Sequence, residues 1–573
     1  MEGAYLHNFV QATFDALQAT GMDIAKGSLV IGGDGRYYND KAIQIIIKMA
    51  VANGVTRMWV GEKGLLSTPA TSALIRERGP VWQKAFGAFI LTASHNPGGP
   101  DEDFGIKYNC ENGGPAPEKL TNLIYTNTGS INKYHMCSSF PDVDVSAPGT
   151  TVVKSDDGSE VVTVQVVSAT EEHVSLLKTI FDFDALKALV ARPDFSFCYD
   201  SMNGVQGPYA KAIFVDELGA DPDCLTNADP KDDFGGLHAD PNLTYAKELV
   251  ATMGLDSKGA PLTDEKDSTG CACLPSGRKV ADIPCFGAAA DGDADRNMIL
   301  GRRFFVTPSD SVAIIAAHAN VIPYFSSQGG LKGVARSMPT SGALDLVAKK
   351  LNLRFFETPT GWKFFGNLMD SHILGGEDLS PFICGEESFG TGSDHVREKD
   401  GMWAVLCWLQ ILAHYNKDPE SMLVHVEDVV QRHWATYGRN YYTRYDYEGV
   451  AADAANQMMD HMRGNFGEWT GSTVDGFSVA KADEFTYHDP VDGSVASKQG
   501  IRILMEDGSR VIFRLSGTGS VGATIRMYIE KYERDANKLD MVPAAALEGL
   551  VNLGLKLSKL QELTGRDTPT VIT

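Results

Sequence analysis

Residues 88–99 read Ala-Phe-Ile-Leu-Thr-Ala-Ser-His-Asn-Pro-Gly-Gly, four apolar residues followed at once by a polar turn that contains glycine. The same change from a short apolar run to a polar turn occurs near residues 29–36, 195–204, 286–296, 333–342 and 381–388. Helix-like stretches separate these runs, and strands that alternate with helices are typical of α/β domains built on largely parallel sheets. Ligands bind such sheets at the carboxyl ends of the strands, where these turns lie. The sequence therefore predicts an α/β fold whose turns carry the functional residues.

The length of 573 residues suits about four domains of ordinary size. We expect three α/β domains, followed by a smaller α+β domain where alternating strand patterns such as 500–505 and 510–515 begin to dominate. The predicted domains cover residues 1–184, 185–305, 306–426 and 427–573.

Two segments are expected to be elaborations of this plan. Residues 145–163 have no helical period and should form an exposed hairpin or loop, and residues 255–284 are polar and glycine-rich. The similar turns Ser201–Gly204 and Ser337–Gly342 hint that the α/β domains are repeats.

The composition excludes several classes of protein. Lysine and arginine total 51 against 74 aspartates and glutamates, a formal net charge of −23, which disfavours binding to nucleic acid or anionic membranes. A small anionic substrate stays possible if basic groups gather in one cleft. Nine cysteines are too sparse for a disulfide framework, and the apolar run 312–325 is too short to cross a bilayer. With no signal-peptide pattern at the N-terminus, we expect a reduced, cytoplasmic protein.

Three aspartates alternate with small residues in Asp291-Gly-Asp293-Ala-Asp295. In an extended loop this alternation points the carboxylates to a common side, where a divalent cation relieves their repulsion. A calcium-binding EF-hand would need Gly and Glu where this chain has Arg296 and Arg302. A solvated acidic turn is the alternative. Three carboxylates beside an arginine suit Mg²⁺ with a phosphate oxygen as a further ligand.

The other polar turns offer groups for phosphate and sugar. Ser94 and His95 follow an apolar run, although a serine that caps a helix would look the same, and Lys107 could return to the same cleft. The loop 385–393 combines carboxylates and hydroxyls that suit sugar hydroxyls, and it is followed by cations available for phosphate, namely His395, Arg397 and Lys399. The glycines, hydroxyls and arginines of 514–520 suit phosphate, although a tight hairpin is the alternative.

Taken together, these loops resemble those of the α-D-phosphohexomutase superfamily, and within it the parafusin-like phosphoglucomutases. Residues 92–99 resemble the phosphoserine loop, 291–296 the metal loop, 385–393 the sugar loop and 514–520 the phosphate loop. The resemblance extends from about Asn8 to Thr573. It implies four domains in a heart-shaped arrangement around one cleft, three of them related α/β domains.

The resemblance also implies roles for individual residues. Ser94 would be the phosphorylated nucleophile and would share Mg²⁺ with Asp291, Asp293 and Asp295, while His95 and Lys107 are candidates for proton transfer and charge stabilisation. The substrate-binding residues would fall into three groups. Arg296 would orient the phosphate of Ser94, and the sugar would be contacted by Thr360, Gly361, Trp362, Glu386 and Ser388. The phosphate that is not being transferred would be bound by Lys399, Arg514, Ser516, Thr518, Ser520 and Arg526.

The activity implied is the interconversion of glucose 1-phosphate and glucose 6-phosphate, with glucose 1,6-bisphosphate as intermediate and activator. The alternatives are a phosphohexomutase or phosphopentomutase of broader sugar choice, or a catalytically weakened regulatory phosphoprotein. The expected partner is a small phosphorylated sugar, with no nucleic acid and no transmembrane segment, and the chain should be a monomer or weak dimer.

Two differences from the family pattern stand out. Relatives carry a Gly-Thr-Ser-Gly-Leu-Arg segment before the region that matches residues 8–11, and this chain does not contain it. Either the sequence is truncated here, or one phosphate-facing cation and an edge strand are missing, and the loss of such a cation can cost orders of magnitude in rate. Ala294 stands where relatives often have glycine.

Overall fold

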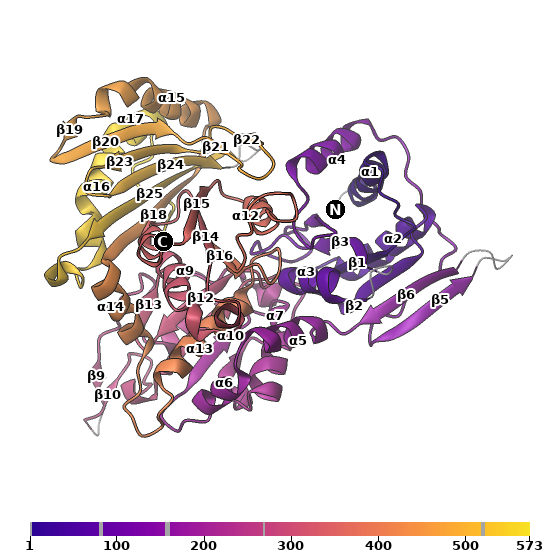
Figure 1. Ribbon diagram of the computed structural model, residues 1–573, viewed down its shortest axis with the longest axis horizontal. Helices are drawn as coiled ribbons and strands as arrows, with labels where there is room; N and C mark the ends of the chain where they lie inside the picture. Colours follow the sequence, from indigo (N-terminus) through magenta and orange to yellow (C-terminus); the bar gives the residue numbers. More distant parts are fainter. Residues whose placement is uncertain (1–2, 80–83, 155–160, 268–269, 517–521) are drawn as a thin grey trace.

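A computed structural model describes residues 3–79, 84–154, 161–267, 270–516 and 522–573 of the chain. Four main sheets follow one another along the sequence, one for each predicted domain, although β13 of the second sheet ends at Val306, one residue beyond the predicted range 185–305. Figure 1 shows the first sheet on the right and the last at the upper left, with the two middle sheets between them. The exact domain boundaries stay a prediction.

The first sheet has the strand order β4-β3-β1-β2-β6-β5, and its four inner strands are parallel. Every residue of β1 and β3 is buried, as expected for strands covered by helices on both faces. Ile43, Ile46 and Ile47, at helical spacing in α2, bury one apolar side in the core of this domain. The strands are β1 (Ser28–Gly33), β2 (Arg57–Leu65), β3 (Ala85–Leu91), β4 (Ile106–Cys110), β5 (Gly149–Lys154) and β6 (Val161–Val167), and the helices are α1 (Tyr5–Ala19), α2 (Asn39–Ala52), α3 (Thr68–Glu77) and α4 (Glu118–Ser130).

The second and third sheets have the orders β13-β12-β11-β7-β8 and β15-β14-β16-β17. Their strands are β7 (Phe197–Asp200), β8 (Leu225–Thr226), β11 (Phe286–Ala290), β12 (Asn297–Gly301), β13 (Phe304–Val306), β14 (Gly333–Ser337), β15 (Arg354–Thr358), β16 (Phe382–Gly385) and β17 (Thr391–Ser393). Their main helices are α5 (Glu171–Ile180), α6 (Phe183–Val190), α9 (Pro308–Ala317), α11 (Ala343–Leu351), α12 (Trp362–Met369), α13 (Gly401–Tyr415) and α14 (Val426–Tyr437).

One strand arrangement recurs in all three α/β sheets. A parallel strand ends in a loop that carries predicted site residues, and the chain returns in an antiparallel strand beside it: β3 to β4, β11 to β12, and β16 to β17. The parallel neighbours of β3, β11 and β16 are β1, β7 and β14. The turns Ser201–Gly204 and Ser337–Gly342 follow β7 and β14, and therefore occupy equivalent places, as the repeat prediction requires.

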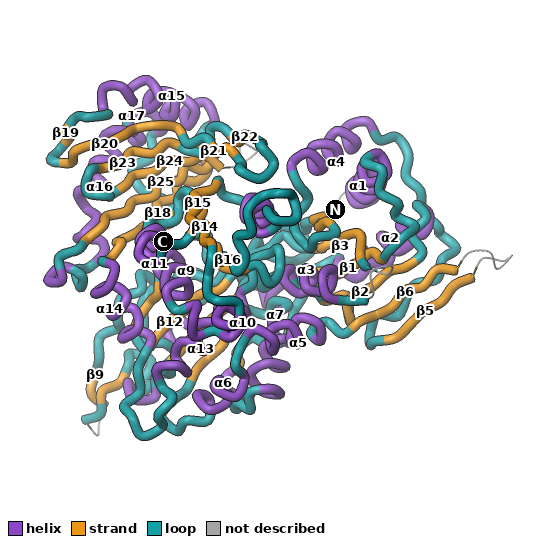
Figure 2. The backbone as a smooth tube through the Cα atoms, viewed as in Figure 1, coloured by secondary structure: helices purple, strands orange, loops and turns teal. Residues whose placement is uncertain are grey.

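The fourth sheet is antiparallel and has the order β19-β20-β23-β24-β25-β18-β26. Helices α15 (Ala452–Trp469) and α16 (Pro543–Ser558) contribute Met458, Met462, Leu550 and Leu553 to its core. Figure 2 shows α15 above these strands. The strands are β18 (Arg439–Val450), β19 (Thr473–Val474), β20 (Phe477–Glu484), β23 (Ile501–Met505), β24 (Arg510–Ser516), β25 (Ala523–Glu533) and β26 (Val571–Ile572). The antiparallel sheet begins with β18 at Arg439, after helix α14, and the predicted boundary at residue 427 stays a prediction.

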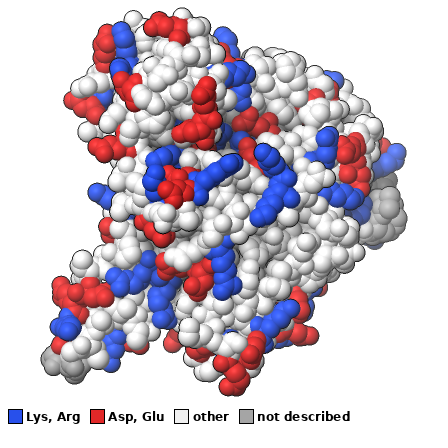
Figure 3. All heavy atoms as spheres, turned by 60° about the vertical axis from the view of Figure 1, so that its left-hand side comes forward, with Lys and Arg blue, Asp and Glu red and all other residues white. Residues whose placement is uncertain are grey.

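The two predicted elaborations are also resolved in part. Strands β5 and β6 form an antiparallel hairpin, as expected for residues 145–163. Within 255–284 the structure has a short ladder, β9 (Glu265–Lys266) with β10 (Ala272–Cys273). Among the described residues, no helix combines the length and apolarity that a membrane span requires. On the face shown in Figure 3, acidic and basic side chains are intermixed, so the net charge of −23 is not concentrated in one patch there.

Asp310 should make the stability of the fold depend on pH. It is buried in the first turn of α9 and accepts a 3.3 Å bond from Trp434 Nε1. Burial raises the pKa of this carboxyl from 3.8 to about 6, while Arg439 opposes the shift. Between these values the unfolded chain loses a proton that the folded chain keeps, so this group's contribution to stability falls as pH rises from 4 to 7.

We therefore expect Asp310→Asn to gain stability relative to wild type by up to about 3 kcal/mol over that pH range. Thermal melting of both proteins at pH 4.5 and pH 7.5 measures the difference. If the two proteins differed in melting temperature by the same amount at both pH values, the result would contradict the assigned cost of ionising Asp310.

Candidate active site

Loops from the three α/β domains meet at the carboxyl ends of their parallel strands. Ser94 Oγ, after β3, donates a 3.1 Å hydrogen bond to Asp291 Oδ2, after β11. Arg296 forms a β-bridge with Gly390, in the loop after β16. Three loops that are about 200 and 100 residues apart in sequence are thus joined directly.

The serine loop holds Ser94 in a left-handed conformation, with φ at +54°. This conformation is costly for a residue with a Cβ and is usually maintained by surrounding contacts, often at functional sites. The backbone N–H of Ser94 donates to Thr92 Oγ1 at 2.7 Å, and Thr92 Oγ1 donates to the buried Asp34. His95 Nδ1 lies 3.4 Å from Ser94 Oγ. Burial, and then the charge on Arg296, lower the pKa of His95 to about 3, so its ring is neutral at pH 7.

Arg36 holds the serine loop through hydrogen bonds to its backbone carbonyls, a role that the sequence alone does not indicate. Its Nη2 donates to the carbonyl of Ser94 at 2.9 Å and its Nη1 to the carbonyl of Asp103 at 2.8 Å. Its Nε donates to both oxygens of Asp34, so the buried charge is paired. In the sequence, the run Gly32-Gly-Asp-Gly-Arg36 indicates only a polar turn, because its spacing does not reveal that Arg36 contacts the serine loop.

Arg36→Lys should lower kcat by about tenfold to a hundredfold, because one ammonium cannot hold two carbonyls and a carboxylate at once. Arg192→Lys is a matched control. Arg192 also pairs with an aspartate, Asp194, and donates to the carbonyls of Asp418 and Ser421, but it precedes β7 at the opposite end of its sheet. Steady-state rates and melting curves of both variants test the point. Equal rate losses in both would indicate a general loss of stability instead.

The three predicted metal ligands lie together and are buried. Among the described residues, Asp291, Asp293 and Asp295 form the one group of potential metal-binding side chains whose ligand atoms all lie within 4.8 Å of one another. Burial and mutual repulsion raise the pKa of Asp291 and of Asp295. The Oδ1 atoms of Asp293 and Asp295 are buried and have no hydrogen-bond partner in the part of the chain that the structure describes. Unpaired buried carboxylate oxygens are costly, so the donor set fits a hard divalent cation.

Basic and hydroxyl groups surround the aspartates. Asp293 Oδ2 accepts from Thr68 Oγ1 at 2.8 Å and from Lys107 Nζ at 3.2 Å. Although burial alone would raise it, these neighbours and Lys399 lower the pKa of Asp293. Thr68 is brought here because Ser67 and Pro69 start helix α3 at this point.

Lys399 lies at the metal loop. Its Nζ is 3.2 Å from Asp295 Oδ2, whereas the family resemblance implies a place among the residues that bind the phosphate that is not being transferred. The next residue, Asp400, accepts from Trp403 N at the start of α13, and its Oδ2 lies 2.6 Å from His173 Nε2 and 3.0 Å from His395 Nε2. Two buried histidines therefore anchor the segment that presents Lys399.

The other two cations of that run do not face the site. His395 is taken up by Asp400 and by Ser393 Oγ, 2.7 Å from its Nδ1. Arg397 is buried and donates to Asp370. The expectation that both are available for phosphate was wrong, because both side chains are buried and already engaged by these partners. Burial also lowers the pKa of His395, so its ring is not a cation of the kind expected.

Glu398 is a buried carboxyl that sequence patterns gave no reason to single out. Asn109 Nδ2 donates to its Oε1 at 2.8 Å. Burial raises its pKa to about 7, against the opposing charge of Lys107. It links the strand that carries Lys107 to the loop that carries Lys399.

Arg296 faces Asp240 and the metal loop. Its Nη1 is 3.3 Å from Asp240 Oδ1, its Nε is 3.9 Å from Asp291 Oδ2, and its backbone N–H donates to Asp291 Oδ1. His238, two residues before Asp240, stacks on His95 with ring centroids 6.2 Å apart. His238 and Asp240 were not predicted, since no local spacing connects them to the serine loop.

The predicted sugar-binding residues come together around Glu386. Its Oε1 accepts from the backbone N–H of Gly361 at 2.9 Å, and burial raises its pKa. Gly361 has φ at +128°, which favours glycine over any residue with a side chain. The Oγ1 of Thr360 and the Nε1 of Trp362 are buried without hydrogen-bond partners among the described residues. Ser388 is half-buried in the same loop.

The predicted phosphate-binding arginines lie directly opposite each other, Arg514 in β24 and Arg526 in β25. Like charges at such positions repel. Arg444, in β18, adds a third guanidinium, and Asp446 lies near both it and Arg526, at 3.0 and 3.8 Å. Burial lowers the pKa of Arg514, but the charges on Tyr528, Glu387 and Glu386 raise it above its ordinary value. The arginines therefore lie close to the sugar loop and form a positive site suited to phosphate. Ser516 ends β24, and Thr518 and Ser520 lie outside the described residues.

Comparisons with known proteins bear on this arrangement. Residues 1–135 match "Phosphoglucomutase/phosphomannomutase, alpha/beta/alpha domain I", residues 308–429 match domain III of the same family, and residues 439–570 match "Phosphoglucomutase-1, C-terminal domain". The cytoplasmic phosphoglucomutases of Solanum tuberosum and Pisum sativum are 60% and 59% identical to the chain, over 99% of it and 94% of each relative. The crystal structure of the Paramecium phosphoprotein pp63/parafusin, a phosphoglucomutase in its open form, superimposes with a TM-score of 0.87 at 48% identity. That match covers 100% of this chain and 94% of the other.

Proposed function

This chain belongs to the phosphoglucomutase/phosphomannomutase family, and we propose that it is a phosphoglucomutase that interconverts glucose 1-phosphate and glucose 6-phosphate. The observation that carries the proposal is the contact between Ser94 Oγ and Asp291, beside two carboxylate oxygens that lack partners. A serine hydroxyl at the edge of a buried acidic triad is placed to carry a phosphoryl group whose charge a cation must offset. The relatives that are about 60% identical are named phosphoglucomutases, which supports the choice of sugar.

The residues present fit a magnesium ion. Asp291, Asp293 and Asp295 would hold it, with an oxygen of phosphorylated Ser94 as a further ligand. When bound, the ion would neutralise the carboxylates and polarise the transferring phosphoryl group. Other oxygen-preferring divalent cations share this donor chemistry, so the identity of the metal is part of the proposal.

The phosphoryl group would move in two steps, first from Ser94 to the sugar and then from the sugar back to Ser94. In the first, O6 of glucose 1-phosphate attacks the phosphorus on Ser94, the bond to Ser94 Oγ breaks, and glucose 1,6-bisphosphate forms. The bisphosphate then reorients so that its 1-phosphate faces Ser94. Ser94 Oγ attacks that phosphate, and glucose 6-phosphate leaves. His95, whose neutral ring lies 3.4 Å from Ser94 Oγ, is the candidate to accept the proton of the attacking hydroxyl and to return it. Lys107, whose ammonium donates to Asp293, is the candidate to stabilise the charge that develops. Arg296 and Lys399 would stabilise the charge on the transferring group.

The remaining predicted residues would hold the sugar through both steps. Thr360, Gly361, Trp362, Glu386 and Ser388 surround the hydroxyls, and a carboxylate with hydroxyl groups can bind either orientation of the ring. Arg514 and Arg526, with Arg444, would bind the phosphate that is not being transferred. Thr518, Ser516 and Ser520 stay part of this proposal on sequence grounds. We also propose a cytoplasmic location, as the relatives' names state for them.

A coupled assay tests the function directly. Purified protein, Mg²⁺ and a trace of glucose 1,6-bisphosphate should convert glucose 1-phosphate faster than mannose 1-phosphate or ribose 1-phosphate. Comparable kcat/KM values for all three sugars would favour the broader mutase. Absence of turnover with any of them would overturn the enzyme assignment.

A further inference from the structure

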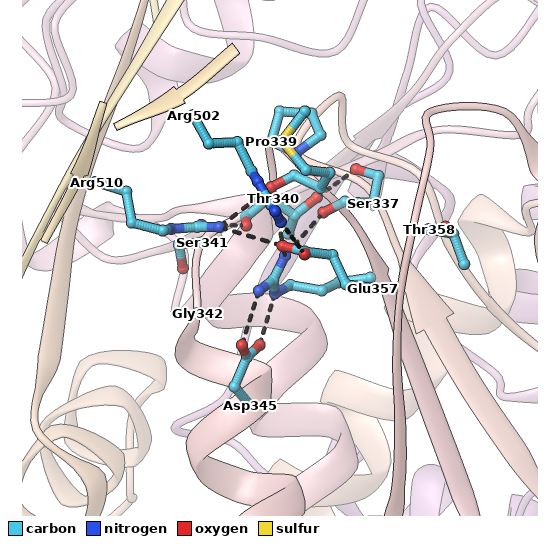
Figure 4. Close-up of polar contacts among 12 residues, drawn as sticks. Ser337, Pro339, Thr340, Ser341, Gly342, Asp345, Glu357, Thr358, Arg502 and Arg510 are labelled. Carbon is cyan, nitrogen blue, oxygen red and sulfur yellow. Dashed lines mark hydrogen bonds and ion pairs between the residues drawn. The ribbon is translucent and has the colours of Figure 1, made fainter. Parts of the chain in front are cut away.

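The turn Ser337–Gly342, which follows β14, contacts two parts of the molecule that have separate tasks in the proposed reaction. Its backbone is held by the C-terminal domain, which carries the phosphate-binding arginines. Its hydroxyls hold the sugar loop. Figure 4 shows the guanidinium of Arg510 approaching this turn from one side, with Ser337 on the other.

The contacts to the C-terminal domain are made by the backbone of the turn. Arg510 donates to the carbonyls of Thr340 at 2.6 Å and Met338 at 3.2 Å. Tyr442 Oη donates to the carbonyl of Pro339 at 2.9 Å, and Gly342 N donates to Glu530 Oε1 at 2.8 Å. Four hydrogen bonds from three strands, β18, β24 and β25, thus fix the turn to this sheet.

A network of ion pairs also connects the third domain, next to this turn, with the C-terminal domain. Arg336, at the end of β14, donates to both oxygens of Asp345 and to Glu357 Oε1 at 2.9 Å. Arg502, from β23, donates to Glu357 Oε2 at 2.6 Å (Figure 4). Because Arg336 is buried and Arg502 largely so, these pairs resist solvent screening better than surface pairs do.

The contacts to the sugar loop are made by two buried hydroxyls of the same turn. Thr340 Oγ1 accepts from the backbone N–H of Glu387 at 2.9 Å. Ser337 Oγ donates to Glu387 Oε2 at 3.0 Å and lies 2.6 Å from Thr340 Oγ1. Both hydroxyls are fully buried, and Glu387 is only 4% exposed. Glu387 lies between Glu386 and Ser388, the two residues placed at the sugar.

We propose that Thr340 is a positioning residue that ties the sugar loop to the C-terminal domain. It fixes the backbone of Glu387, and through it Glu386 and Ser388, while Arg510 fixes the carbonyl of the same threonine. The sugar loop is therefore linked, through this one turn, to the sheet that carries the phosphate-binding arginines. This inference rests on the proposed function and adds a specificity-determining contact to it.

Thr340→Val tests the proposal, because it keeps the shape of the side chain and removes the acceptor of the Glu387 N–H. We expect KM for glucose 1-phosphate to rise about tenfold or more, with a smaller change in kcat, since the sugar contacts act in the ground state and the transition state alike. Thr340→Ser retains the hydroxyl and should restore KM. Ser341→Ala is the matched control, since that buried hydroxyl accepts only from Ala343 N among the described residues and does not touch the sugar loop.

Arg510→Lys tests the same coupling from the other side and serves if Thr340→Val does not fold. It should also raise KM, and its effect and that of Thr340→Val should be less than additive when combined. A KM within twofold of wild type in both single variants would overturn the inference, as would an equal rise in Ser341→Ala. Turnover by the wild-type protein is measured first, so a failure of the proposed function is recognised separately.

Discussion

Ser94→Ala is expected to lower kcat by about 10⁴-fold or more, because covalent catalysis through this oxygen has no substitute in the site. Among the described residues, Thr68 is the other hydroxyl that donates to the acidic triad, and it is not placed to replace Ser94. Thr68 Oγ1 donates to Asp293, but it belongs to the first turn of α3 and is fully buried. Glucose 1-phosphate turnover, followed with glucose 1,6-bisphosphate present, measures the loss.

Two further observations make this result specific. After incubation with glucose 1,6-bisphosphate, phosphopeptide mapping should place phosphate on Ser94 in the wild type and on no residue of 92–99 in the variant. Ser130→Ala, at the exposed end of α4, should leave the rate unchanged. A Ser94→Ala protein that turns over normally would refute the assigned nucleophile.

Removal of the metal is expected to have the second largest effect. Chelation should remove most of the turnover, and Mg²⁺ should restore it, because three buried carboxylates beside a phosphorylated serine repel one another without a cation. Asp293→Asn should lower kcat by about 10²- to 10³-fold, a loss comparable to that of a key electrostatic contact in a buried site. The variant also leaves Lys107 without its nearest carboxylate.

A measurement without turnover gives an independent check on the metal site. Mg²⁺ should raise the melting temperature of the wild type, and Asp293→Asn should reduce that rise. Asp310→Asn replaces a buried aspartate of α9 that accepts from Trp434 and is not part of the triad, and it should respond to Mg²⁺ as the wild type does. An unchanged response in Asp293→Asn would argue against the triad as the metal site.

The sequence predicted the parts of the site that are local. Ser94, the three aspartates and Glu386 each lie in a turn directly after an apolar strand, and the rule that ligands gather at strand ends placed them correctly in one region. The fold class followed from the same pattern. Even the repeat was visible, in the two similar turns after β7 and β14.

The residues that sequence reasoning missed act across the fold. Arg36 reaches a loop about 60 residues away, and Asn109 reaches Glu398 across 289 positions. Lys399 and Arg397 are two residues apart, yet one faces the metal loop and the other is held by Asp370. Which side chain of a polar run faces the cleft depends on packing partners that are distant in sequence, and no local pattern contains them.

The recurring arrangement of a parallel strand, a loop and an antiparallel return strand has an evolutionary consequence. Leu91 pairs with Ile106, Ala290 with Asn297, and Gly385 with Thr391, so the two ends of each loop are fixed on adjacent strands roughly 5 Å apart. Each loop can then change in length or amino-acid sequence while the pairing of the two strands, and therefore the sheet, stays the same. Duplicated domains of this kind can divide labour, with one keeping the nucleophile, one the cation, and the third free to adapt to a new sugar.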